Sequence, residues 1–180
     1  MIGKGKSISH GVAALEYDLA KEINGQAVAT EIARHELYGC TGAEMVQEMK
    51  PYHIDFPNVK NNCLRFEVSP SIEESATFTD ADWAELGNDF MQRMGLANHQ
   101  YIIIRHSGTE SKKEQAHLHI LANRVSLSGE LYRDNWIGKK ATEAANAIAK
   151  ERNFVQSQDI GKVNKAEILS LIHISEPTRP

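Results

Sequence analysis

The stretch that most constrains the fold is residues 100–125, QYIIIRHSGTESKKEQAHLHILANRV, in which two apolar segments flank a polar turn. Successive side chains of a strand point to opposite faces of a sheet. This alternation places His117 and His119 on one face, and it places Leu118 and Ile120 on the other face, which is apolar enough to pack on helices. The stretch therefore predicts a β-hairpin around which the rest of the chain is organised.

A third histidine stands at the end of the first strand of this hairpin. His106 is expected to face the same way as Ile104, and it approaches His117 and His119 across the ladder if the two strands pair. Three imidazoles on one sheet face are a plausible divalent-metal site with open positions for a substrate oxygen. Alternating histidines also occur as hydrogen-bonded polar residues on half-exposed strands, so the triplet alone leaves both interpretations open.

Helices and strands are mixed along the rest of the chain. Residues 63–69 alternate in the manner of a half-buried strand, whereas residues 27–34 fit either a strand or a helix. Helical periodicity and capping residues indicate four longer helices. Their expected caps are Ser7 or Ser9, Thr41 with Glu44, Thr79 with Asp82, and Asp134 or Asn135. With hairpins that suit antiparallel pairing, this order of elements predicts an α+β fold.

Composition indicates an ordinary single domain. The chain has 180 residues, 41% of them hydrophobic, and no apolar run approaches the ~20 residues of a membrane span. A net charge of −4 argues mildly against a nonspecific nucleic-acid coat. Cys40 and Cys63 are too few for a disulfide framework. Together these features predict a cytoplasmic protein without a membrane segment.

The last eleven residues, 170–180, do not continue the pattern of the fold. Their sequence, SLIHISEPTRP, resembles the translated read-through of a sequencing adapter; an ordinary proline-containing tail is the alternative. We therefore expect one domain at residues 1–169, truncated at its C-terminus, followed by a non-native tail at 170–180 that carries no function.

Three motifs in order resemble those of the relaxase, or mobilisation nuclease, family, in particular the forms found in Bacteroides-type mobile elements. The opening GKSISHGVAALEY is similar to the first motif, which ends in a nucleophilic tyrosine, here Tyr17. RFEVSPS is similar to the second motif, whose serine, here Ser69, helps to hold DNA beside the nick. The third motif corresponds to three metal-binding histidines and the two polar residues that follow: His106, His117, His119, Asn123 and Arg124.

The resemblance covers roughly residues 1–152 and implies the HUH endonuclease fold, a central, mainly antiparallel sheet with helices packed on it. It also implies an activity. Tyr17 attacks single-stranded DNA at an origin of transfer and forms a 5′-phosphotyrosine, aided by Mg²⁺ or Mn²⁺ on the histidines. A tyrosine hydroxyl, with a pKa of about 10, is a poor nucleophile at neutral pH unless a cation polarises the phosphate. The further partners implied are accessory relaxosome proteins and a coupling protein.

One departure from the family pattern affects these expectations. Relaxases commonly have an acidic residue two positions after the first ligand histidine, where this chain has Gly108, and Glu110 or Glu114 is the candidate substitute. An inactive or truncated single-stranded-DNA-binding module of the same fold is therefore the main alternative function. A rolling-circle initiator is disfavoured because Tyr17 precedes the histidines. His99 is the nearest competitor of His106 as a ligand.

Overall fold

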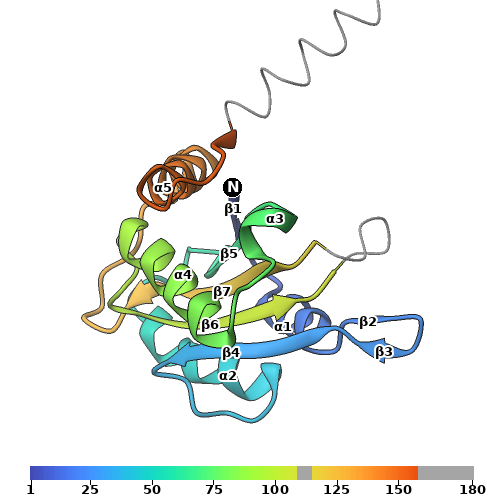
Figure 1. Cartoon of the computed structure of the whole chain (residues 1–180). Helices are drawn as coiled ribbons and strands as arrows, with labels where there is room; N and C mark the ends of the chain where they lie inside the picture. The colour runs from blue at the N-terminus through green and yellow to red at the C-terminus, as the bar shows by residue number, and fades with distance from the viewer. Residues whose placement is uncertain (109–114, 158–180) are drawn as a thin grey trace, which may run out of the picture.

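The computed structural model of the protein describes residues 1–108 and 115–157. Its centre is a five-stranded sheet in the order β1-β5-β7-β6-β4, in which all neighbouring strands pair antiparallel. Helices pack on both faces of this sheet (Figure 1), so the predicted α+β fold with a central antiparallel sheet is confirmed. The elements are β1 (Ile2–Ile8), α1 (Gly11–Leu19), β2 (Glu22–Ile23), β3 (Gln26–Ala27), β4 (Ala29–His35), α2 (Gly42–Met49), the 3-10 helix Lys50–His53, β5 (Cys63–Ser69), α3 (Ile72–Ser75), α4 (Asp80–Arg93), β6 (His99–His106), β7 (His117–Ser126) and α5 (Ile137–Glu151).

The predicted hairpin is formed by β6 and β7 in the middle of the sheet. His106 pairs with His117, and Ile104 pairs with His119. Side chains alternate as expected, since Leu118 lies in the hydrophobic core on the face opposite the histidines. β7 is hydrogen-bonded to β5 on its other side. Two of the three histidines therefore stand on a strand that is held from both edges.

One face of the sheet is covered by α4 and α5 (Figure 1). Trp83, Leu86 and Phe90 share one side of α4 and are almost completely buried in this core. α5 packs directly on β1 because Gly3 has no side chain there. A Cβ at Gly3 would lie 2.4 Å from the carbonyl oxygen of Ala141. This close approach fixes the edge of the sheet beneath α5.

The opposite face is covered by α1 and α2 over part of its length. Leu15 of α1 and Met45 of α2 pack there against Ile102 and Leu121 in a second hydrophobic core. Beyond α1 the face is polar, and its side chains line a groove instead of a core. We refer to this region as the polar half-face; its residues are Lys4, Lys6, Arg65, Glu67, Ser69, His117 and His119.

Several local signals in the sequence are confirmed. The hydroxyls of Thr41 and Thr79 accept hydrogen bonds from the backbone N–H groups of Glu44 and Asp82, which completes both predicted capping boxes. Gly95 ends α4 with a φ of 73°, a conformation that costs glycine little. The segment that fits either a strand or a helix is the edge strand β4.

The predicted caps of the first helix are wrong. α1 begins directly after His10, whose side chain makes no capping hydrogen bond. Ser7 is part of β1, where it pairs with Leu64, and Ser9 lies between the strand and the cap position. The edge strand β1 thus includes one of the two predicted cap residues.

The predicted cap of the last helix is also wrong, by one or two residues. α5 follows Trp136, which adopts the left-handed conformation with φ at 60°. The carboxylate of Asp134 does not cap the helix because it accepts a hydrogen bond from Arg124, 2.6 Å away. Trp136 is 80% exposed, so its indole is not part of either core.

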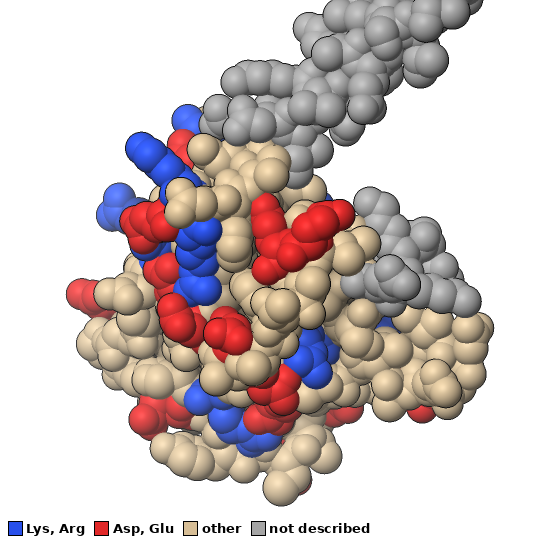
Figure 2. All heavy atoms as spheres, viewed as in Figure 1, with Lys and Arg blue, Asp and Glu red and all other residues tan. Residues whose placement is uncertain are grey.

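Charged side chains on the face that carries α4 and α5 are of both signs. Figure 2 shows acidic and basic groups interleaved there, and Arg93 pairs with both Asp89 and Glu151. Among the residues that the structure describes, that side therefore shows no extended surface of a single charge. Within the described ranges, no helix has the length and apolar character needed to cross a membrane. The predicted boundary at residues 169 and 170 lies outside the described residues.

Candidate metal centre

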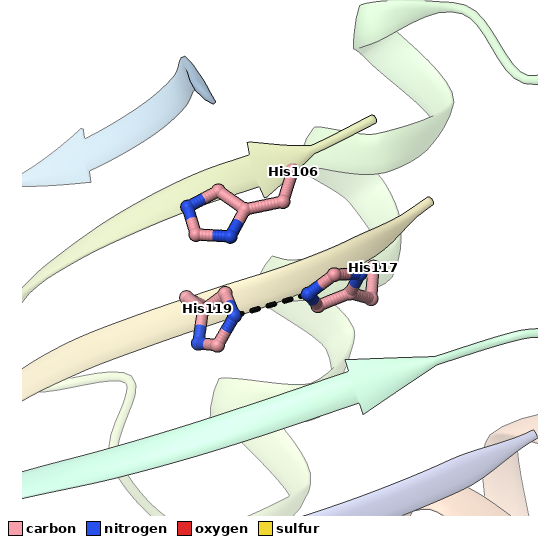
Figure 3. Close-up of side chains that lie close together, drawn as sticks. All are labelled: His106, His117 and His119. Carbon is pink, nitrogen blue, oxygen red and sulfur yellow. Dashed lines mark hydrogen bonds between the residues drawn. The ribbon is translucent and has the colours of Figure 1, made fainter. Parts of the chain in front are cut away.

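The three predicted histidines converge at the ends of β6 and β7. Figure 3 shows the ring of His106 facing the rings of His117 and His119 from the neighbouring strand. One ring nitrogen of each lies within 4.8 Å of those of the other two, and the Nε2 atoms of His117 and His119 are 3.1 Å apart. Nitrogen ligands about 2.1 Å from one ion lie at most roughly 4 Å from each other. A closure of less than about 1 Å would therefore bring all three onto a common cation.

Burial keeps two of these imidazoles, His106 and His119, in the form that binds cations. It lowers the pKa of His106 below its ordinary value, and the charges of His117 and Lys21 act in the same direction. Burial also lowers the pKa of His119 to about 2, with further contributions from the neighbouring histidines and Arg65. Neutral imidazole offers a lone pair to a metal, whereas imidazolium does not. The donor set thus fits a divalent cation.

A buried carboxylate that sequence reasoning missed lies against the triad. Asp18 is 1% exposed and accepts two hydrogen bonds from Arg65, at 3.1 Å and 2.5 Å. Burial raises the pKa of Asp18, and the hydrogen bond and charge of Arg65 oppose that rise. The available signal was helical spacing, because Asp18 lies on the buried side of α1 with Ala14 and Leu15. An acid on an apolar stripe requires a partner.

Tyr17, the predicted nucleophile, lies on the exposed side of the same helix. Tyr17 is 57% exposed, and the ammonium of Lys21 donates a 2.7 Å hydrogen bond to its hydroxyl. The Lys21 nitrogen also lies 4.8 Å from the centre of the Tyr17 ring. The charge of Lys21 acts on the pKa of His106, so this pair lies within electrostatic range of the triad.

Ser69 lies at the end of β5 on the polar half-face. Val68 pairs with Leu118, so Ser69 comes next to His117 at the end of the ladder. It is 8% exposed, and its hydroxyl accepts a 3.1 Å hydrogen bond from Gln115. This position, beside a predicted ligand, is compatible with its predicted contact to DNA.

The other predicted polar residues stand farther along β7. Asn123 is fully buried. It lies four residues along β7 from His119, which on a strand is about 13 Å. Its amide oxygen contacts His53 Nε2 at 2.7 Å, and its amide nitrogen donates to Gln100. Arg124 binds the carbonyl oxygens of Tyr132 and Asn61 as well as Asp134. Both side chains therefore already have partners that hold loops to the sheet, and their roles in DNA or metal binding stay predictions.

Two further candidates differ in their placement. Glu110, like its alternative Glu114, lies outside the described residues. His99 begins β6, seven residues before His106, and its Nδ1 lies 2.9 Å from the carbonyl oxygen of Asn123. The described cluster of possible ligands contains His106 and not His99.

A groove of about 200 Å³ runs from His119 across β5 to β1. Its charged lining consists of Lys4, Lys6, Arg65 and Glu67. Three of these four groups are cationic, and Glu67 pairs with Lys4 at 2.9 Å. The groove thus combines positive charge with one edge of the triad, a combination suited to a phosphate ester.

The geometry agrees with comparison to known proteins. A family model described as relaxase, MobA/VirD2-like, nuclease domain matches residues 17–154. The chain belongs to this relaxase family. The relaxase domain also resembles a solved structure, the conjugative relaxase TrwC in complex with oriT DNA in its metal-bound form, with a TM-score of 0.50 and 12% identity over 89% of this chain and 70% of that chain. At this identity the likeness shows the fold. Comparison with curated proteins gives no significant match.

The resemblance to relaxases inferred from three motifs is therefore confirmed for the family and its fold. The family match of this relaxase domain begins at Tyr17 and includes all three histidines, whereas β1 and its groove lysines precede it. The closer relation to Bacteroides-type elements stays a prediction.

Proposed function

We propose that this relaxase domain nicks single-stranded DNA at an origin of transfer, with Tyr17 as the nucleophile and a divalent cation on His106, His117 and His119. The observation that carries the proposal is the convergence of three imidazoles, two of them with lowered pKa values, beside the helix that carries Tyr17. Membership in the relaxase family supports it.

The proposed reaction exchanges one phosphate ester for another. The Tyr17 oxygen loses its proton and forms a bond to the scissile phosphorus, and the bond from phosphorus to the 3′ oxygen of the preceding nucleotide breaks. That oxygen takes up a proton and becomes a free 3′-hydroxyl, while the 5′-phosphate stays on Tyr17. Because the number of ester bonds is unchanged, the 3′-hydroxyl of another strand can reverse the step without an external energy source.

Two features of the chain assist this reaction. The ammonium of Lys21, hydrogen-bonded to the Tyr17 hydroxyl, stabilises negative charge on that oxygen as the proton leaves. A cation on the triad would polarise the phosphate and neutralise charge on its oxygens. Three nitrogen donors suit Mn²⁺ better than Mg²⁺, which prefers oxygen ligands. We therefore propose Mn²⁺ as the more tightly bound of the two predicted ions.

The groove provides a path for the DNA backbone. Lys4, Lys6 and Arg65 line it next to His119, so a strand whose scissile phosphate sits at the triad can lay neighbouring phosphates along β1 and β5. Glu67 opposes them, but its ion pair with Lys4 is largely exposed and contributes at most about 1 kcal/mol.

The deciding experiment incubates the full chain with labelled single-stranded oligonucleotides tiled across the native element, in Mn²⁺ or Mg²⁺. We expect a covalent protein–DNA band on a denaturing gel that disappears with chelator and with Tyr17→Phe. Tyr38→Phe, which removes another exposed tyrosine hydroxyl, is the matched control and keeps the band.

An alternative result has a clear meaning. If the wild type binds Mn²⁺ and shifts the oligonucleotides but never forms the covalent band, the protein is the single-stranded-DNA-binding module and the nicking proposal is wrong. Accessory relaxosome proteins and a coupling protein stay predictions that rest on the family resemblance, and a cytoplasmic location stays a prediction that rests on composition.

A further inference from the structure

Asp18 is a buried charged side chain to which the proposed reaction assigns no task. It follows Tyr17 directly in α1, and it is held by Arg65 of β5 through a two-pronged contact, Nε to Oδ2 at 3.1 Å and Nη2 to Oδ1 at 2.5 Å. Taking a carboxylate out of water is costly even with an arginine partner. Its position beside the triad calls for an explanation beyond stability.

Asp18 contacts the triad at two points. Its backbone carbonyl oxygen lies 2.7 Å from His106 Nε2, and its carboxylate oxygen Oδ1 lies 3.7 Å from His119 Nδ1. The first contact is a hydrogen bond in which the imidazole N–H must donate, because a carbonyl oxygen only accepts. His106 therefore keeps the lone pair of Nδ1 for a ligand.

The hydrogen bonds of the other two rings define their tautomers without a cation. His117 Nδ1 donates to the carbonyl oxygen of Gln115 at 3.1 Å, which leaves the lone pair on His117 Nε2. The Nε2 atoms of His117 and His119 are 3.1 Å apart, so one of them must donate an N–H to the other, and this N–H must then belong to His119. His119 Nδ1 correspondingly accepts the 3.4 Å contact from Arg65.

Binding a cation through Nε2 of His119 requires the other tautomer. The ring proton must then sit on Nδ1, and a group that accepts it must be close by. The Asp18 carboxylate is an acceptor at 3.7 Å, and a small rotation of the ring or the carboxylate completes the hydrogen bond. Carboxylates that receive the second N–H of a metal-bound histidine fix its tautomer and orientation.

We propose that Asp18, held in place by Arg65, is a positioning residue that links cation binding at the triad to the placement of the helix that carries Tyr17. The inference rests on the proposed function for the identity of the ligand. Asp18 and Tyr17 are consecutive residues of α1. The free energy that the carboxylate and carbonyl of Asp18 add to cation binding is therefore the free energy by which a bound cation stabilises this helix in its position.

The first test measures Mn²⁺ affinity of the full chain by calorimetry in the absence of DNA. Asp18→Asn keeps the shape of the side chain and removes its charge, and we expect binding to weaken by roughly 10–100-fold. Asp134→Asn removes a carboxylate of similar geometry that pairs with Arg124 on another part of the sheet, and it leaves the affinity unchanged. Equal affinities of Asp18→Asn and the wild type would overturn the proposal.

A second measurement needs no variant and covers the case in which Asp18→Asn does not fold. Amide hydrogen exchange of the wild-type protein is compared with and without Mn²⁺, and we expect slower exchange in α1 and unchanged exchange in α4, which lies on the other face. Unchanged exchange in α1 at saturating Mn²⁺ would contradict the link.

The results separate this inference from the proposed function. Mn²⁺ binding without a covalent DNA adduct refutes nicking and leaves the role of Asp18 supported by the affinity difference. An adduct together with equal Mn²⁺ affinities refutes the role of Asp18 alone. A wild-type protein that binds no Mn²⁺ refutes both.

Discussion

The ammonium of Lys4 lies 2.9 Å from the carboxylate of Glu67, on adjacent strands at the rim of the groove beside His119. The pair is exposed, so its contribution to stability is small, but along the proposed DNA path it would withhold the charge of Lys4 from a phosphate. We expect Glu67→Gln to strengthen binding of single-stranded DNA and Lys6→Gln to weaken it.

The salt dependence of this binding tests whether the groove contacts phosphates. Each phosphate contact on a single strand contributes about 0.7 to the slope of log affinity against log salt. Lys6→Gln should reduce the slope by about that amount in fluorescence anisotropy titrations, whereas Glu151→Gln, on the face opposite the groove, leaves it unchanged. An unaltered slope for Lys6→Gln would exclude this groove as the DNA path.

The stability of the fold should fall in mild acid because of His99. Burial lowers its pKa in the folded state below the ordinary value of about 6.5, and the hydrogen bond to the Asn123 carbonyl only partly compensates. Between the two pKa values the unfolded chain binds more protons, so the stabilising contribution is complete above about pH 6.5 and is lost as the pH falls toward the folded-state pKa.

Urea denaturation at pH 7.5 and pH 5, with chelator present, measures this effect. His99→Gln should lose less unfolding free energy between the two pH values than the wild type does. His10→Gln, at an exposed position, should behave like the wild type. If His99→Gln and the wild type lose the same amount, burial of His99 does not contribute to the acid sensitivity.

The two cysteines should react with thiol reagents at very different rates. Cys40 is exposed, whereas Cys63 is fully buried and its pKa is raised to about 11 by burial. At pH 8 we expect one fast thiol in the folded protein and a second only after unfolding. Cys40→Ser should abolish the fast phase, and a fast phase that persists in this variant would show that Cys63 is accessible.

Contact between α1 and the sheet depends on the absence of a side chain at Gly11. A Cβ there would lie 2.6 Å from Cys63 Sγ and 3.6 Å from Val46. We expect Gly11→Ala to destabilise the fold by about 1–3 kcal/mol through overpacking, measured by urea denaturation. Gly138→Ala is the matched comparison, because its Cβ meets only a carbonyl oxygen at 3.5 Å, and it should stabilise the fold by about 0.4–1 kcal/mol.

Features encoded by neighbouring residues could be predicted from the sequence. The approach of His106 to His117 follows from a hairpin whose side chains alternate between the two faces. The capping boxes at Thr41 and Thr79 follow from an acidic residue three positions later in the sequence. The predicted ligand triad was therefore accessible to reasoning about period and register.

Contacts between distant segments could not be predicted in this way. Asp18 and Arg65 are 47 residues apart, and their meeting depends on how α1 lies across β5 and β7, which no local pattern specifies. The groove likewise forms only because β1 pairs with β5. From the sequence alone, its lysines indicate no more than the polar side of a strand. α5 begins after the left-handed Trp136 and not after Asp134. The ion pair of Asp134 with Arg124 outweighs the preference of Asp134 for a capping position.

The division of one sheet face into a hydrophobic core and a polar half-face has a consequence for how this relaxase domain can change. Substitutions at Lys4, Lys6 or Glu67 remove no buried hydrophobic contacts, so each should alter the free energy of unfolding by only about 0.5 kcal/mol. If the groove holds the DNA backbone as proposed, sequence drift at these positions changes the strength of DNA binding, while the cores on either side continue to specify the same fold.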